Sequence, residues 1–258
     1  QKASPRMFLL RLWFATVISF AIFCRVYGQP PRVFYSPGAF WPKSTNTSQH
    51  HMISDSLSTS LLELKWMKSI SNVGLPYGSN IIEVSRDVAN QYKYVAQFEG
   101  PLEGEDWTVV IWNTIGPDGS PDGWYGKACR EFTLAPGQRR YIAFDENSLG
   151  GWAIAPGPSI PIDSDGGYAS TWGDFAFGSN LRRGWSSFDV STTAAQTAGF
   201  EIQGMKICDV ITEICSFVTR KGGLLHNAYT RETAGEMNIG GQLAPGPARL
   251  SVTVDYDA

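Results

Sequence analysis

From residue 81 to its end, the chain is a succession of short runs rich in β-branched and aromatic residues, separated by Gly, Pro and Asp. Short runs bounded by such turn residues are typical of β-strands. About eleven can be marked by this criterion. They cover residues 81–84, 92–98, 107–112, 131–134, 140–144, 151–155, 175–177, 185–190, 200–207, 214–218 and 250–256.

The spacing of these runs also limits the topology. Parallel strands need long crossover connections, usually helices, and only residues 192–198 interrupt the series as a possible helix. The sequence therefore predicts an all-β fold, an antiparallel β-sandwich, with a barrel as the alternative. A thaumatin-like sandwich has a similar strand pattern, but the chain has only 4 Cys, so that likeness is an analogy of fold alone.

Composition supports one globular domain of this kind. The 258 residues are 43% hydrophobic and 17% charged, which suits a folded chain and not a disordered one. The 27 Gly, 15 Pro and 9 Trp fit many tight turns between aromatic strands. A formal net charge of -3 provides no broad positive field for a phosphate backbone, so no nucleic acid partner is expected.

The N-terminal region is typical of a secreted protein. Residues 1–6 are interpreted as an extension and residues 7–28 as a signal peptide, with a basic Arg11, an apolar run over 12–24 and a small Gly28 for cleavage. A membrane-spanning helix needs about 20 apolar residues. We therefore expect a secreted, extracellular protein with no membrane attachment after cleavage.

Between the signal peptide and the β-rich region, residues 29–73 are predicted to form a linker. Its first part is rich in Pro, Ser and Thr and is predicted to be disordered. Within it, Asn46 begins an Asn-Thr-Ser triplet that is a possible N-glycosylation site. Apolar residues at helical spacing over 56–70 predict a short amphipathic helix. Residues 74–258 are then expected to form the β-sandwich domain.

Three cysteines remain after cleavage, in a compartment that favours disulfides. Cys208 and Cys215 flank a predicted turn between two strands, so we expect a disulfide across that hairpin. Cys129 is then unpaired, and we interpret it as a buried thiol. An intermolecular disulfide or a nucleophilic role is the alternative, although no His lies near Cys129 in the sequence.

Metal and cofactor sites are not indicated. Asp118 and Asp122 lie in a Gly- and Pro-rich loop and have a spacing that suits calcium, but Asp-Gly pairs form turns without a metal, and turn formation is favoured. Of the three histidines, His50 and His51 are adjacent in the linker and His226 is distant. No metal site and no cofactor are expected.

Catalytic residues are likewise not evident. Two carboxylates of a set could serve glycoside hydrolysis, which would make the chain a carbohydrate-active enzyme, but loop carboxylates are usually solvated. That set is Asp145, Glu146, Asp163, Asp165 and Asp174. No Gly-x-Ser-x-Gly elbow is present. The prediction is a protein without enzymatic activity.

Aromatic residues suggest a different kind of site. Rings that face solvent stack on sugars, whereas rings in a β-sandwich usually fill the core. Core packing is favoured, and contact with fungal wall polysaccharide is the alternative. The candidates for glycan contact are Trp124, Tyr125, Trp152, Trp172 and Trp185.

Several long strings resemble the fungal secreted allergen family of the Aspergillus Asp f four type. They are GSNIIEVS at 78, QYKYVAQFEG at 91, WTVVIWNTIGPDGSPDGWYG at 107, GGWAIAPGPSIP at 150, GGYASTWGDFAFG at 166, QGMKICD at 203, NAYT at 227 and LSVTVDYDA at 250. The resemblance covers residues 75–258. It implies an extracellular fungal protein that host IgE can bind, with no established catalytic activity. The N-terminal third lacks the longer low-complexity spacer expected of this family, and Cys129 is atypical.

Overall fold

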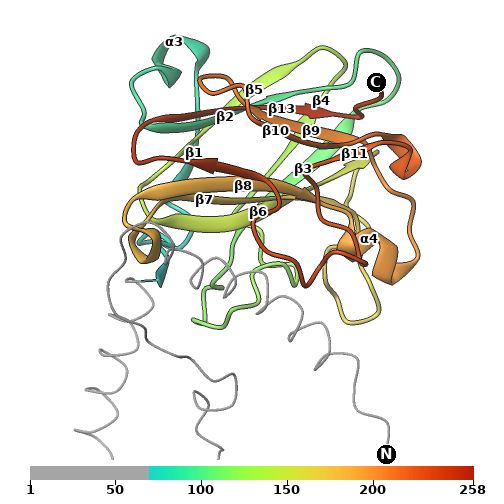
Figure 1. Ribbon diagram of the computed structural model, residues 1–258, viewed down its shortest axis with the longest axis horizontal. Coiled ribbons are helices and arrows are strands. Elements are labelled where there is room, and N and C mark those ends of the chain that lie inside the picture. The colour runs from blue at the N-terminus through green and yellow to red at the C-terminus, as the bar shows by residue number, and fades with distance from the viewer. Residues whose placement is uncertain (1–69) are drawn as a thin grey trace, which may run out of the picture.

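The computed structural model describes residues 70–258. These residues form two β-sheets stacked face to face (Figure 1). The extension, the signal peptide, the linker up to residue 69 with Asn46, and all but the last residue of the helix expected over 56–70 lie outside the described residues. Within residues 70–258, every helix is too short or too polar to cross a membrane.

The first sheet has seven strands. In spatial order they are β1 (Ile81–Val84), β5 (Arg139–Phe144), β2 (Tyr94–Glu99), β13 (Ala248–Val254), β9 (Met205–Asp209), β10 (Cys215–Val218) and β11 (Leu225–His226). All neighbours pair antiparallel except β2 and β13, which are parallel. Chain segments from both ends of the domain therefore meet in the middle of this sheet.

The second sheet has six strands and is antiparallel throughout. Its order is β12 (Gly241–Leu243), β8 (Trp185–Ser191), β7 (Thr171–Ser179), β6 (Ser148–Pro156), β3 (Trp107–Asn113) and β4 (Arg130–Leu134). The short helices of the described chain are α3 (Arg86–Ala89), α4 (Thr193–Ala198), η1 (Asn180–Arg182) and η2 (Arg220–Gly222). They connect strands and do not form a layer of their own.

The main core lies between the two sheets. Trp152 of β6 is fully buried there and packs against Phe98 of β2, with ring centroids 5.1 Å apart, and against Phe175 of β7 at 5.5 Å. Aromatic contacts of this kind stabilise a sandwich beyond their burial of apolar area.

The two sheets differ on their outer faces. Strand β13 alternates between buried and half-buried residues, as expected where one face is open. Strand β3 is buried at all 7 positions, which requires a cover on both faces. The six-stranded sheet therefore has an additional layer on its outer side.

The sequence-based fold class is confirmed: the described chain is all-β, mainly antiparallel, and arranged as a sandwich. The helix expected near residues 192–198 is present as α4. Three features differ from the prediction, and one of them is the parallel pairing of β2 with β13. The run 200–207 becomes a strand only from Met205, and the short strands β11 and β12 had no alternating pattern by which to find them.

Candidate functional site

Aromatic side chains close the outer face of the six-stranded sheet. Trp112 of β3 and Trp172 of β7 project from the sheet, and Trp124 and Tyr168 reach them from the connecting loops. The Trp112 ring centroid lies 5.3 Å from that of Tyr168 and 5.1 Å from that of Trp172. Trp172 also donates a hydrogen bond from Nε1 to the Tyr168 carbonyl oxygen at 3.0 Å. We call these four residues the aromatic layer.

A pair of carboxyl groups lies on the same face, beside the aromatic layer. Asp174 of β7 and Asp189 of β8 are direct cross-strand partners. Their neighbours Phe175 and Phe188 belong to the core between the sheets, so alternation directs both carboxyl groups to the outer side. Side chains directly opposite each other in such a pair are in contact range.

The surroundings of this carboxyl pair are tight and apolar. A Cβ atom at Gly151 would lie 2.9 Å from Asp174 Oδ1 and 2.7 Å from Trp112 Cζ2, and one at Gly240 would lie 2.6 Å from Asp189 Cβ. The two glycines thus leave the room that the carboxyl groups and the indole fill. Any larger residue at Gly151 would push Trp112 and Asp174 apart.

Neither carboxyl group is fully satisfied. Asp189 is buried and Asp174 is half-buried, yet Asp174 Oδ1 and Asp189 Oδ2 both have essentially no exposed surface and no hydrogen-bond partner among the described residues. The buried Trp112 Nε1 is in the same condition. Unpaired buried polar atoms are rare in folded proteins and often mark a functional role.

Burial changes the acidity of the pair. It raises the pKa of Asp174 to about 7. Burial, and then the charge of Asp174, raises the pKa of Asp189 well above its ordinary value. The nearby Tyr229 phenol also has a raised pKa, because of its burial and then the charge of Asp189. A neutral carboxyl group can donate a hydrogen bond, whereas an ionised one can only accept, so the protonation of this pair decides what it can bind.

The structure does not gather the carboxylates considered from the sequence. Asp145 and Glu146 are exposed after β5, and Glu146 forms an ion pair with Lys93 at 2.9 Å. Asp163 accepts hydrogen bonds from the backbone N–H of Asp165 and of Gly167, each at 2.9 Å, and so forms a turn. These residues have local structural roles.

Asp174 is the member of that set that lies opposite another carboxyl group across two paired strands. Its partner, Asp189, was missed because it follows Phe188 in an alternating strand, a pattern that normally places Asp in solvent. The only sequence signal for its burial was the richness of aromatic residues in the loops that cover this face.

In the Gly- and Pro-rich loop that contains Asp118 and Asp122, the side chain of Lys127 neutralises both carboxylates. Lys127 Nζ lies 2.8 Å from Asp118 Oδ2 and 2.7 Å from Asp122 Oδ1, and the Ser120 N–H donates to Asp118 Oδ1. The carboxylates therefore serve an ion pair and a turn. Across residues 70–258, no group of three or more His, Cys, Asp or Glu side chains is placed to hold a metal.

Most aromatic candidates for glycan contact are interior. Trp152 lies in the core between the sheets, and Trp124 and Trp172 belong to the aromatic layer, with 8% and 4% of their surface exposed. A sugar cannot stack on these rings while the loops remain in place, so the core interpretation is correct for them. Tyr125 is half-buried against the layer, and Trp185 at the start of β8 is 38% exposed.

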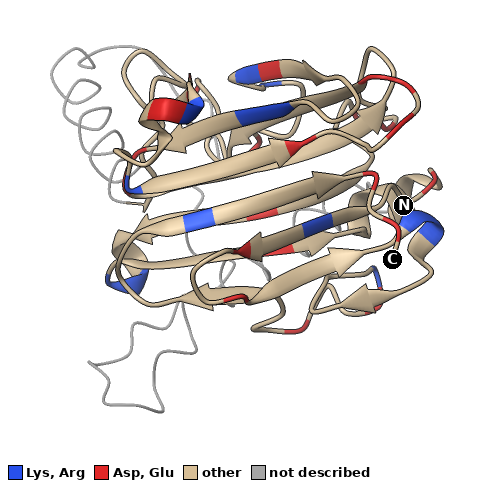
Figure 2. Ribbon diagram, turned by 90° about the horizontal axis from the view of Figure 1, so that it is seen from above, with Lys and Arg blue, Asp and Glu red and all other residues tan. Residues whose placement is uncertain are grey.

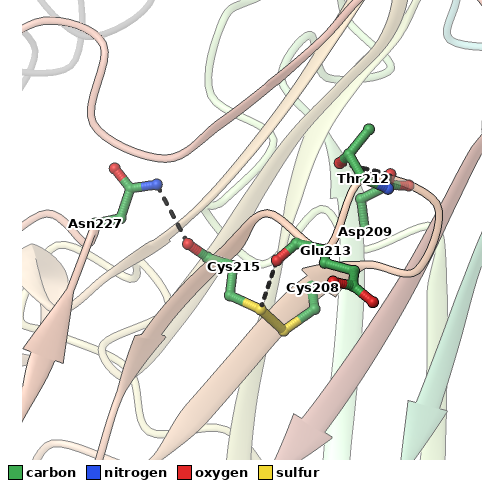
Figure 3. The surroundings of a disulfide bond; sticks show 6 residues. All are labelled: Cys208, Asp209, Thr212, Glu213, Cys215 and Asn227. Carbon is green, nitrogen blue, oxygen red and sulfur yellow. Dashed lines mark hydrogen bonds between the residues drawn. A yellow bond between two sulfur atoms is a disulfide. The ribbon is translucent and has the colours of Figure 1, made fainter.

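The expected disulfide joins Cys208 of β9 to Cys215 of β10 (Figure 3). Beside it, Asp209 Oδ2 accepts hydrogen bonds from the backbone N–H and the hydroxyl of Thr212, at 2.8 and 2.9 Å, which fixes the turn between the strands. Asn227 donates to the Cys215 carbonyl oxygen at 3.2 Å. The disulfide thus belongs to a well-braced hairpin.

Cys129 is a free, half-buried thiol that packs against the core. Burial raises its pKa to about 11, so the reactive thiolate form is scarce at neutral pH. Its Sγ donates to the Ile111 carbonyl oxygen at 3.4 Å. These contacts favour a structural role for Cys129.

His226 is exposed on β11, where its ring stacks on Phe217 with centroids 5.3 Å apart.

The fold and the site define a two-sheet β protein with a disulfide-braced hairpin on one sheet and a covered carboxyl pair on the other. The chain belongs to the family of the Allergen Asp f 4-like domain, whose sequence model matches residues 79–254. The resemblance noted from the sequence is therefore confirmed.

Among known proteins, the chain is similar to Allergen Asp f 4 of Aspergillus fumigatus, with 50% identity over 185 residues. The match covers 72% of this chain and 57% of the relative, so the chain spans little more than half of that protein. Among solved structures, it is similar to the protein elicitor MoHrip2 from Magnaporthe oryzae, with a TM-score of 0.40 and 12% identity. That match covers 63% of this chain and 99% of the elicitor.

Proposed function

We propose that this chain is a secreted, extracellular fungal protein that host IgE binds as an allergen and that has no catalytic activity of its own. The observation that carries the proposal is the 50% identity to Allergen Asp f 4 across most of the described domain. Antibodies recognise folded surfaces, and chains this similar share much of their surface when they share a fold.

Two further observations support secretion. The disulfide between Cys208 and Cys215 suits an oxidising compartment, since cytosolic thiols are kept reduced. Residues 7–28 have the charge and apolar pattern of a signal peptide. Acidic and basic residues are also interspersed along the strands (Figure 2), a distribution that gives no reason to propose a nucleic acid partner.

IgE binding is tested by competition. The purified protein is added to sera from donors sensitised to Allergen Asp f 4, and residual IgE binding to that allergen is measured. Competition by the folded protein, weakened after reduction and unfolding, is the expected result. If the folded protein fails to compete in sera that recognise the relative strongly, the allergen proposal is wrong.

Secretion is tested separately, with residues 7–258 expressed in a yeast host. We expect the protein in the medium, without residues 7–28 and with one free thiol per chain. Retention of the full-length chain inside the cells would contradict the extracellular assignment. The same purified protein, incubated with wall oligosaccharides, should release no new reducing ends.

Wall polysaccharide is a second candidate partner, and the observation that favours it is the exposure of Trp185. Leu181 of the adjacent η1 turn is 55% exposed, so an apolar surface suitable for a sugar face lies at this end of β7 and β8. Pull-down on insoluble chitin, β-glucan and cellulose tests it. Binding should be lost in Trp185→Ala and kept in Phe200→Ala, which removes a similarly exposed ring elsewhere; equal binding by both variants would exclude this surface.

A further inference from the structure

The carboxyl pair of Asp174 and Asp189 is not explained by the proposed function. Its two buried oxygens have no hydrogen-bond partner, and each carboxyl group lies directly opposite the other across β7 and β8. Two ionised carboxylates in such a position would repel each other and would both lack hydration. The strand pair can hold this arrangement only if at least one of the two groups is neutral.

We propose that Asp174 and Asp189 share one proton, that this proton holds β7 against β8 under the aromatic layer, and that its loss opens the outer layer of the six-stranded sheet. The neutral carboxyl group donates a hydrogen bond to the ionised one, which satisfies oxygens that otherwise have no partner. The device is a proton-dependent lock between two neighbouring strands.

The groups that face the pair do little to stabilise a second negative charge. Trp112 and Gly151 are uncharged, and the six residues of α4 carry no charge. Tyr229, in the segment after β11, is near enough that the pair's charge affects it, and Glu236 adds a carboxylate beside it. Arg182 donates to the side-chain oxygen of Gln242 on β12, and Lys127 of the covering loop is paired with Asp118 and Asp122.

The aromatic layer connects the carboxyl pair to a measurable signal. Trp112 Cζ2 and Asp174 Oδ1 both pack over the bare backbone of Gly151, and Trp172 is two residues from Asp174 on the same face. A second ionisation would draw water towards Asp174 and displace the indole that covers it. The fluorescence of Trp112 and Trp172 should therefore respond to the protonation of the pair.

The direction of the pH dependence follows from the raised pKa values. Asp174 has a pKa of about 7 in the folded protein, above the value of about 4 for an unfolded Asp. The folded state thus holds a proton that the unfolded state has released in this range. Because burial and then the charge of Asp174 raise the pKa of Asp189, Asp174 ionises first and Asp189 keeps the shared proton to higher pH. Stability from the pair is complete below pH 4, falls as the pH rises through 7, and falls further when Asp189 ionises.

The test measures the urea midpoint and the tryptophan emission maximum of the purified protein from pH 4 to pH 9. The wild type should lose stability and shift its emission to longer wavelength as the pH rises. Asp189→Asn supplies a permanent amide donor to Asp174, so its pH-dependent loss should be at most half that of the wild type. Asp118→Asn, which changes an exposed carboxylate, should behave as the wild type.

An infrared measurement on the wild type keeps the proposal falsifiable if a variant fails to fold. At pH 6 the carbonyl band of a protonated carboxylic acid should be present, and it should weaken as the pH rises through 7 and Asp174 ionises. Absence of that band at pH 6, or an unchanged pH dependence in a folded Asp189→Asn protein, would overturn the shared proton. Full recovery of alkaline stability with millimolar calcium would also overturn it, since a cation would then be the natural partner of the pair.

Discussion

Two neighbouring strand pairs of this protein each place identical side chains directly opposite one another. On β9 and β10 the pair is Cys208 and Cys215, joined by a disulfide. On β7 and β8 it is Asp174 and Asp189, two carboxyl groups with no other partner for their buried oxygens. The first link is covalent, whereas the second depends on a proton.

The two links differ because their surroundings differ. Cys208 and Cys215 are half-buried on the open outer face of the seven-stranded sheet. Their link is a covalent bond, so its strength does not depend on the exclusion of water. The carboxyl pair lies on the covered face of the six-stranded sheet, beside the aromatic layer. Exclusion of water and a neighbouring carboxylate both favour the protonated form of a carboxyl group near neutral pH. The cover therefore gives this second link its pH dependence.

The largest effect is expected from Trp112→Ala, which removes part of that cover. Trp112 is fully buried, and truncation of a buried Trp costs about 3–5 kcal/mol of unfolding free energy. Water would then reach Asp174 and lower its pKa, so the loss of stability between pH 5 and pH 8.5 should become smaller than in the wild type. Urea denaturation at both pH values measures both effects.

Trp185→Ala is the control for this experiment, because Trp185 is exposed at the start of β8 and lies outside the aromatic layer. Its stability should stay within about 0.5 kcal/mol of the wild type, with the full pH dependence. A Trp112→Ala protein that keeps the full pH dependence would show that the indole does not control the acidity of the pair.

A comparable effect is expected from pH alone. Because each unit of pKa shift corresponds to about 1.4 kcal/mol, the raised pKa of Asp174 allows a loss of up to roughly 4 kcal/mol as the pH rises from 4 to 8. The disulfide does not titrate in this range. Denaturation series with the disulfide intact and reduced should therefore run parallel, and a slope that disappears on reduction would contradict the independence of the two links.

Loss of the disulfide should have a smaller effect. The bond closes a loop with a sequence separation of 7, for which chain entropy predicts a stabilisation of about 2 kcal/mol. The double variant Cys208→Ser, Cys215→Ser should lose this amount equally at pH 5 and at pH 8.5. A pH-dependent loss, measured by the same denaturation series, would mean that the two strand pairs are coupled.

The same comparison explains how much the sequence could predict. The disulfide hairpin was found from the sequence because its determinants are local: two cysteines flank a turn between strand-like runs. The sandwich fold was predictable for a similar reason, since each strand has its own alternation and turn residues. The parallel pairing of β2 with β13 was not, because it joins segments about 150 residues apart.

The carboxyl pair could not be predicted because its determinants are not local. Asp174 was a candidate because of its charge. Asp189 lies at a position of its strand whose side chain points away from the core, where a side chain is normally exposed to solvent. Its burial depends on loops that cross the outer face of the sheet and on a glycine at Gly240 that leaves room. A single sequence does not specify which loops cover which face.

The smallest effect is expected from Lys127→Met in the loop that carries Trp124. Lys127 bridges Asp118 and Asp122, but the ion pairs are partly exposed, so their loss should cost less than about 1 kcal/mol. This substitution tests whether the covering loop must be anchored for the carboxyl pair to keep its proton. Because Trp124 is held by its own contact with Trp172, at a centroid distance of 6.5 Å, we expect an unchanged pH dependence.

The two carboxylates freed by the substitution should bind calcium weakly, so millimolar calcium should restore the stability of the variant and leave the wild type unchanged. A flattened pH dependence in Lys127→Met would instead show that the lock extends from the strands to the loop, because a small local loss would then have exposed the buried pair.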